Sequence, residues 1–286
     1  MRFIVSHTTR YRYARPAWLE PHVIRLRPRS DGSQVLLDYR VRLQPRPLGW
    51  SDCVDLDGNA VAQAWFDGLT ESLTVAMTCR VETWRTNPFD FLLDPAATAL
   101  PLRPTGELQR ALAPYCYRSH PDDSVTTFAA SVLREADNQA VSFLATLARR
   151  VTQRCRATVR LEGEPLPPRV TLSEGAGACR DLAVLFIDAC RAVGLPARFV
   201  SGYYCGPIEA ERRYLHAWAE VYLPGAGWRG FDPLQGVAVA DHHVAVAASA
   251  HPSGAAPISG TLRGGSPVAT LDVELRIEPI DAAARS

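Results

Sequence analysis

The sequence lacks a strong excess of charge and any long apolar run. Its 31 basic and 30 acidic residues leave a formal net charge of +1, and the arginines are scattered along the chain. This balance creates no global field that would attract nucleic acid or an anionic membrane. No apolar stretch approaches the length of a membrane span, and MRFIVSHTTRYRYARP lacks the apolar segment of a signal peptide. We therefore expect a cytoplasmic protein that binds neither nucleic acid nor membrane.

The seven cysteines form no CxxC pair, which argues against a zinc ribbon or a thioredoxin-like motif. We expect reduced thiols, as in other intracellular proteins. No P-loop, dinucleotide fingerprint or EF-hand loop is visible. The second half of the chain offers as possible metal ligands Cys179, His216, Asp232, His242 and His243. Their spacing matches no established zinc pattern, so we expect neither a metal nor a cofactor.

The chain of 286 residues is 47% hydrophobic and 21% charged, which is typical of a soluble globular protein with one large or two ordinary domains. Residues 1–85 alternate between apolar and polar positions and predict a β-rich domain. Residues 86–123 contain many prolines and predict an irregular connector. Residues 124–286 predict a second domain that begins with a helical segment at about 126–155 and ends with a strand.

The strongest helix of the chain is predicted directly after Cys179. Apolar residues recur after it at helical spacing, and Gly194 and Pro196 end the pattern. Three strands are predicted next, in ARFVSGYYC, LHAWAEVYL and WRGFDP. His216 lies in the second of these strands and Asp232 in the third.

Cys179, His216 and Asp232 are the residue types that nucleophilic catalysis by a thiol requires. A thiol with a pKa of about 8.5 is mostly protonated at neutral pH, and a helix N-terminus favours the thiolate. An adjacent imidazole can accept the proton and return it to the leaving group, and a carboxylate can fix its orientation. The small residues before Cys179 would let a substrate carbonyl approach, and its backbone N–H would help to stabilise an oxyanion.

The surrounding motifs resemble the transglutaminase-like superfamily of bacterial cysteine enzymes. The resemblance lies in GACRDLA, GLPARFVSGYY, HAWAE and WRGFDP, and in YRYARPAWLEPHVIRLRPR and DLDGN of the first half. It implies an α+β fold, in which a β-rich N-terminal domain precedes a papain-like core over residues 124–286. It also implies a catalytic triad of Cys179, His216 and Asp232. We expect Gly177, Trp218 and Tyr203 to contact the substrate.

Several alternatives remain open at the level of sequence. Asp181 is read as a residue that caps the helix rather than as a catalytic group. Trp218 and Glu220 share the face of His216, where each either lines the site or packs. Relatives often carry a Gly-Arg-Asp-Tyr segment where this chain has VAVAASAHPSGAAP, and Thr-Asn where it has Leu234-Gln235.

These departures leave more than one function open. The first hypothesis is a peptidase or amidase with a peptide or protein substrate, and a transglutaminase differs from it only in the acyl acceptor. The second hypothesis is a peptide-binding module that has kept the fold and lost efficient chemistry. The sequence gives no oligomeric state.

Overall fold

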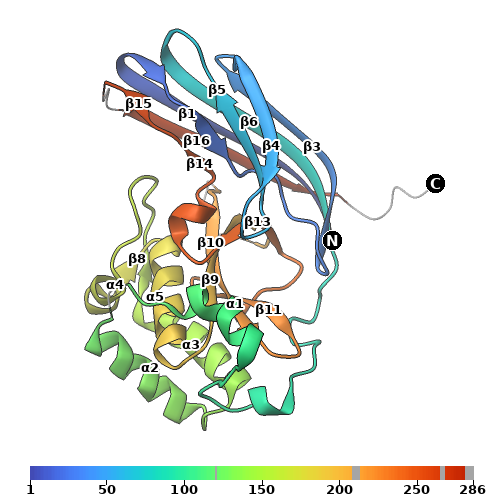
Figure 1. The fold of residues 1–286 in the computed structure, drawn as a ribbon, viewed down its shortest axis with the longest axis vertical. Coiled ribbons are helices and arrows are strands. Elements are labelled where there is room, and N and C mark those ends of the chain that lie inside the picture. Colours follow the sequence, from blue (N-terminus) through green and yellow to red (C-terminus); the bar gives the residue numbers. More distant parts are fainter. Residues whose placement is uncertain (120, 208–212, 265–267, 281–286) are drawn as a thin grey trace, which may run out of the picture.

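The computed structural model describes residues 1–119, 121–207, 213–264 and 268–280. Figure 1 shows two parts, a β-sandwich at one end and a mixed core at the other in which helices pack on a further sheet. The fold is α+β, as the sequence predicts. Among the described residues, no helix has both the length and the apolar character that a membrane crossing requires.

The sandwich consists of two antiparallel sheets. One sheet has the order β15-β1-β6-β3 with β16 also paired to β1, and the other has the order β14-β2-β5-β4. The strands of the first sheet are β1 (Arg2–Leu19), β3 (Gln34–Gln44), β6 (Leu69–Thr83), β15 (Leu262–Arg263) and β16 (Val268–Pro279). Those of the second are β2 (His22–Ile24), β4 (Gly49–Val54), β5 (Ala60–Trp65) and β14 (Ile258–Ser259). Alternate residues of β1 and β6 are buried between the sheets, as the period of two predicts.

The C-terminal strand β16 corrects the expected domain boundary. It pairs antiparallel with β1 from Phe3↔Pro279 to Tyr13↔Val268. The strand therefore belongs to the N-terminal sheet and not to the second domain, where the division at 124–286 puts it. Its alternation predicts a strand, but no local pattern identifies a partner more than 250 residues away.

Short helices form the connector and the first part of the core. They are η1 (Pro95–Ala97), α1 (Gly106–Cys116), α2 (Asp123–Glu135), α3 (Ala140–Arg154) and α4 (Pro168–Glu174). The prediction of one continuous helical segment at about 126–155 is wrong, because the helix ends after α2 and a new helix, α3, begins at Ala140. Asp137 and Asn138 have φ of 50° and 57°, a left-handed conformation that Asp and Asn tolerate better than most residues.

The core sheet has the order β12-β11-β10-β9-β13. Its strands are β9 (Ala197–Tyr204), β10 (His216–Leu223), β11 (Gly227–Asp232), β12 (Val237–Ala238) and β13 (His243–Ser249). Helix α5 (Cys179–Ala192) packs against β9 and β10 and buries Leu182, Leu185 and Phe186. Burying a side chain of this size contributes about 1.5–3 kcal/mol, which anchors the start of α5 over the sheet. The remaining short elements are β7 (Arg156–Ala157), which pairs with β8 (Ala176–Gly177), and η2 (Pro252–Ala255).

The sandwich and the core share buried contacts. Tyr203, Val244 and Val246 of the core sheet lie in the apolar cluster of the sandwich. The Gln34 side chain donates to the Ala245 carbonyl at 2.9 Å and accepts from the Ala245 N–H at 2.7 Å. The N-terminal part thus contacts the strand that begins at His243.

Candidate active site

Four strands of the core sheet bring polar side chains together where they begin or end. His216 is the first residue of β10, Asp232 is the last of β11, and His243 is the first of β13. Tyr204 is the last residue of β9 and pairs with His243 in the β9–β13 ladder. Because neighbouring strands are antiparallel, these ends lie at the same edge of the sheet.

The closest contact at this edge joins His216 and Asp232. His216 Nε2 lies 2.6 Å from Asp232 Oδ2, and both side chains are buried. Burial by itself would lower the pKa of His216, but the charge and hydrogen bond of Asp232, with a further contribution from Cys179, raise it to about 10. Burial would raise the pKa of Asp232, but His216 and His243 together hold it well below its usual value. The pair is therefore an imidazolium and a carboxylate at neutral pH.

Cys179 is the first residue of α5 and is half-buried. Its Sγ lies 4.0 Å from the carbonyl oxygen of Leu215, the residue before His216. Cys179 adds a smaller contribution than Asp232 to the raised pKa of His216. The Cys179 N–H lies in the first turn of the helix, where backbone amides lack intrahelical acceptors. Thiol, imidazole and carboxylate are thus arranged in the order that thiol catalysis uses.

Asp181 caps the helix, the role that the sequence favours for it. Its Oδ2 accepts the Ala178 N–H at 2.8 Å, and its Oδ1 accepts the Leu166 N–H at 2.8 Å and a bond from Arg160 at 2.5 Å. The carboxylate therefore fastens the loop before α4 to the first turn of α5. This holds the backbone around Cys179 in place.

The three residues expected to contact the substrate are packed inside the protein. A Cβ on Gly177 would lie 2.9 Å from atoms of both Asp181 and Leu182, so close packing by itself requires glycine there. Trp218 and Tyr203 are fully buried, and the Tyr203 hydroxyl faces His7 Nδ1 at 3.0 Å. Contact with substrate through these two side chains is therefore contradicted by their burial. Trp218 packs beside His216, with ring centroids 6.1 Å apart.

The sequence reading misses Tyr204 and considers His243 only as a possible metal ligand. The ring of Tyr204, not that of Tyr203, lies 5.9 Å from the His216 ring and 5.0 Å from the His243 ring. His243 Nε2 lies 3.1 Å from the same Asp232 Oδ2 that His216 contacts. The alternation of strand faces distinguishes Tyr204 from Tyr203, but only after the register of β9 is known.

His216, Asp232 and His243 together carry side-chain atoms of the kinds that bind metal ions. Within the described ranges, His216, Asp232 and His243 are the one group of ligand-type side chains with ligand atoms all within 4.8 Å of one another. Their 2.6 and 3.1 Å separations are those of N–H···O hydrogen bonds. Two protonated nitrogens on one carboxylate oxygen therefore account for the cluster.

Glu220 packs rather than lining the site. Its carboxylate contacts Arg29 at 2.6 Å and Arg198 at 2.7 Å, and the two guanidinium groups lower its pKa to about 2 despite its burial. Arg29 comes from the segment after β2, so this buried ion cluster joins the N-terminal part to strand β10.

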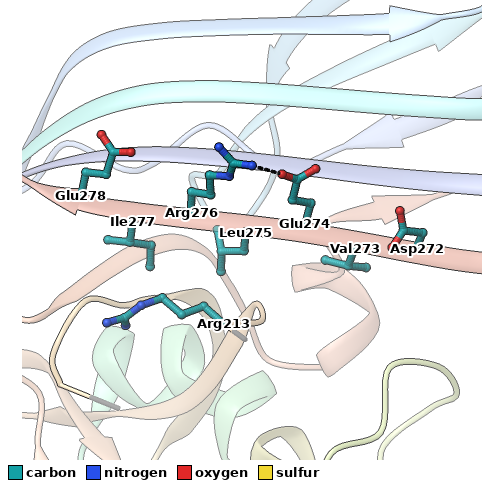
Figure 2. A pocket seen from close by; sticks show the side chains of 8 residues that line it. All are labelled: Arg213, Asp272, Val273, Glu274, Leu275, Arg276, Ile277 and Glu278. Atoms are coloured by element: carbon teal, nitrogen blue, oxygen red, sulfur yellow. Dashed lines mark ion pairs between the residues drawn. The ribbon is translucent and has the colours of Figure 1, made fainter. Parts of the chain in front are cut away.

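A groove lies between strand β16 and Arg213, away from Cys179, His216 and Asp232. It has a volume of about 610 Å³. Figure 2 shows Val273, Leu275 and Ile277 pointing toward the side of Arg213, whereas Glu274 and Arg276 point to the opposite face of the strand. Cys179, His216 and Asp232 are not among the residues that line it.

Comparisons with known proteins agree with this architecture. Residues 126–233 match the family model of the transglutaminase-like superfamily, and residues 3–82 match that of the bacterial transglutaminase-like N-terminal region. The chain therefore belongs to the transglutaminase-like superfamily and carries the N-terminal region of its bacterial members.

The relatives include proteins of similar length and much longer proteins. Uncharacterized protein ML0607 of Mycobacterium leprae is 28% identical over 290 residues, covering 96% of this chain and 98% of that protein. A protein-glutamine gamma-glutamyltransferase of Pseudomonas aeruginosa is 37% identical over 70 residues, covering 22% of this chain and 10% of that protein. A solved structure from Cytophaga hutchinsonii, provisionally described as a cysteine protease, superposes with a TM-score of 0.72 at 20% identity. It covers 98% of this chain and 92% of that one, and it supports the fold.

Proposed function

We propose that the protein is a cysteine-dependent acyl-transfer enzyme that hydrolyses peptide or amide bonds. The observation that supports this most is the buried pair of His216 and Asp232, which interacts with a half-buried thiol at a helix N-terminus. Membership of the transglutaminase-like superfamily supports the same class of chemistry.

In the proposed reaction the Cys179 thiolate forms a bond to the carbonyl carbon, whose electron pair moves onto oxygen. The backbone N–H of Cys179 donates to that oxygen. His216 gives its proton to the amine, which leaves as the C–N bond breaks. A water molecule then attacks the thioester while His216 takes one of its protons, and the thiolate leaves as the carboxylic acid forms. Asp232 keeps the imidazole oriented in both steps.

Transfer to an amine is the second candidate function, and the match to the Pseudomonas aeruginosa protein-glutamine gamma-glutamyltransferase supports it. The two functions share the thioester and differ only in whether water or an amine attacks it. All 31 basic residues of this chain are arginine, so its own side chains provide no lysine amine. Any amine found in a product therefore comes from the reagents or the substrate.

The test is incubation of the protein with a mixture of glutamine-containing peptides, with and without a fluorescent primary amine. Mass spectrometry separates the outcomes: new peptide termini indicate a peptidase, glutamine converted to glutamate indicates an amidase, and an amine adduct indicates amine transfer. We expect hydrolysis that Cys179→Ala abolishes and Cys53→Ala preserves, because Cys53 is an exposed cysteine in the sandwich. Peptides that bind but yield no product in any form would overturn the enzyme and favour the binding module.

A further inference from the structure

The carboxylate of Asp232 is held by more groups than a triad requires. Its Oδ2 faces both His216 Nε2 and His243 Nε2, and its Oδ1 accepts the N–H groups of Leu234 at 2.9 Å and Gln235 at 3.1 Å. For both imidazoles to satisfy this oxygen, each must present an N–H. His243 therefore carries its proton on Nε2, and in the neutral ring the Nδ1 atom is an acceptor.

His243 Nδ1 belongs to a group of unpartnered atoms around one cavity. Within the described ranges, His243 Nδ1, Trp218 Nε1 and Arg29 Nε are buried and lack a hydrogen-bond partner, although Arg29 Nε lies 3.7 Å from the Asp31 carboxylate. All three residues line a small cavity of about 20 Å³, which Gln34 and Glu220 also line. Leaving such groups unpaired in an apolar interior is costly, and three at one cavity indicate a ligand with both donors and acceptors.

A single water molecule has the size and chemistry for this cavity. A polar cavity of roughly 10–15 Å³ or more admits one water, which typically makes about three hydrogen bonds. The Trp218 and Arg29 N–H groups are donors, which the two lone pairs of a water accept. The water can then donate to His243 Nδ1.

We propose that His243 is a positioning residue for Asp232, and that a buried water in the cavity shared with Arg29 and Trp218 keeps it in the tautomer that donates. This inference rests on the proposed nucleophilic role of Cys179. His243 does not touch the reacting atoms. It limits rotation of the carboxylate, so that the His216 Nε2–H stays bonded and the opposite nitrogen stays directed at Cys179.

The charges around His243 come from several elements. Asp232 raises its pKa, whereas burial, which is the larger effect, and His216 and His242 lower it, so His243 is neutral at pH 7. The Tyr204 ring covers one side of it. Arg29, Arg85 and Glu220 line the same cavity as His243. Asp232 is the carboxylate that contacts the His243 ring, at 3.1 Å.

The cavity also gives the N-terminal part a role at the site. Arg29 reaches the cavity while its guanidinium binds Glu220, and Gln34 fixes the backbone of β13 two residues after His243. The water site is therefore built from both parts of the molecule.

The test compares His243→Gln with His243→Leu. Glutamine places an amide N–H near the position of Nε2, whereas leucine fills similar space and donates nothing. The readout is the rate at which iodoacetamide alkylates Cys179 from pH 5 to 10, measured by mass spectrometry. We expect His243→Leu to slow alkylation at pH 7 by about tenfold, because a hydrogen bond to a charged group is lost. We expect His243→Gln to stay within about threefold of the wild type.

Two further variants complete the design. Trp218→Phe removes one N–H from the cavity and should lower the rate by a smaller factor of about threefold. His251→Leu, at an exposed histidine on the same segment, is the control and should change nothing. A high-resolution crystal structure should show a water bonded to His243 Nδ1.

Different results overturn different claims. A wild-type Cys179 that reacts as slowly as the exposed Cys53 would overturn the proposed function itself. A reactive wild type with His243→Leu unchanged would overturn only the positioning role, and so would equal losses in His243→Gln and His243→Leu. A cavity without water in that crystal structure would overturn the water site.

Discussion

Two buried histidines that contact residues of strand β9 have pKa values shifted in opposite directions. His7 of β1 contacts the Tyr203 hydroxyl at 3.0 Å and the Thr9 hydroxyl at 3.2 Å, and burial lowers its pKa to about 4. His216 of β10 pairs with Gly202 of β9, the residue before Tyr203. The pKa of His216 is raised to about 10. Burial lowers the pKa in both cases, and only His216 has a carboxylate to outweigh it.

The difference shows that a neighbouring buried carboxylate raises the pKa of an imidazole, whereas burial by itself lowers it. Hydroxyl groups satisfy the ring nitrogens of His7 without favouring the charged form. The buried Asp232 favours that form strongly enough to keep His216 protonated beside a thiol. The same residue type is thus held neutral in the sandwich and charged in the core sheet.

The largest effect should come from Asp232→Asn, which gives His216 a neutral partner like that of His7. Without the charge, His216 should lose its proton near neutral pH and no longer favour the Cys179 thiolate. We expect alkylation of Cys179 at pH 6 to fall roughly 100-fold, because a thiol of ordinary pKa, about 8.5, is below 1% ionised there. Asp188→Asn, at a buried aspartate of the same helix as Cys179 that pairs with Arg118, is the control. Equal rates in wild type and Asp232→Asn would contradict this account of His216.

Glu220→Gln tests a buried carboxylate whose partners are arginines instead of imidazoles. The variant removes the carboxylate that pairs with Arg198 and leaves Arg29 only the more distant Asp31 at 3.7 Å. We expect a loss of about 3–5 kcal/mol in the free energy of unfolding, measured with denaturant at pH 7. Glu135→Gln, in the exposed pair with Arg150, should cost below about 1 kcal/mol. If both variants lost the same small amount, the cluster between the two parts would not stabilise the fold.

His7 should make the fold sensitive to acid. Its pKa is about 4 when folded and 6.5 in the reference state, so between these values the unfolded chain binds more protons. Its contribution is therefore fully present above pH 6.5 and is lost as the pH falls toward 4, by on the order of 3 kcal/mol in total. His7→Phe should flatten the pH dependence of the unfolding free energy in that window. An unchanged slope would show that another group is responsible.

The sequence predicts the local elements of the site better than its long-range contacts. The helix after Cys179 and the strands of His216 and Asp232 follow from periodicity and turn residues within short segments. The pairing of β16 with β1 and the contact of Arg29 with Glu220 join segments about 190 residues or more apart, which no local pattern encodes. Trp218 and Tyr203 are misassigned because alternation gives the face of a strand but not what covers that face.

His243 shows the same limit at the site itself. The adjacent pair His242-His243 indicates that the two side chains point to opposite faces, but not that one of them reaches Asp232. That contact depends on how the chain passes from β11 through β12 to β13. The stretch VAVAASAHPSGAAP, which departs from the Gly-Arg-Asp-Tyr segment of relatives, begins within β13 and runs past its end, and its effect on catalysis remains a prediction.

The central claim, that Cys179 is an activated nucleophile paired with His216, is tested most directly by alkylation against pH. Burial raises the pKa of Cys79 and Cys205 to about 12 and also raises the pKa values of Cys116, Cys155 and Cys190. These five thiols should react slowly, which leaves the exposed Cys53 as the internal standard. We predict that Cys179 is labelled at pH 6 roughly 100-fold faster than Cys53, and that His216→Ala removes this advantage. Labelling of Cys179 no faster than that of Cys53 would contradict the account.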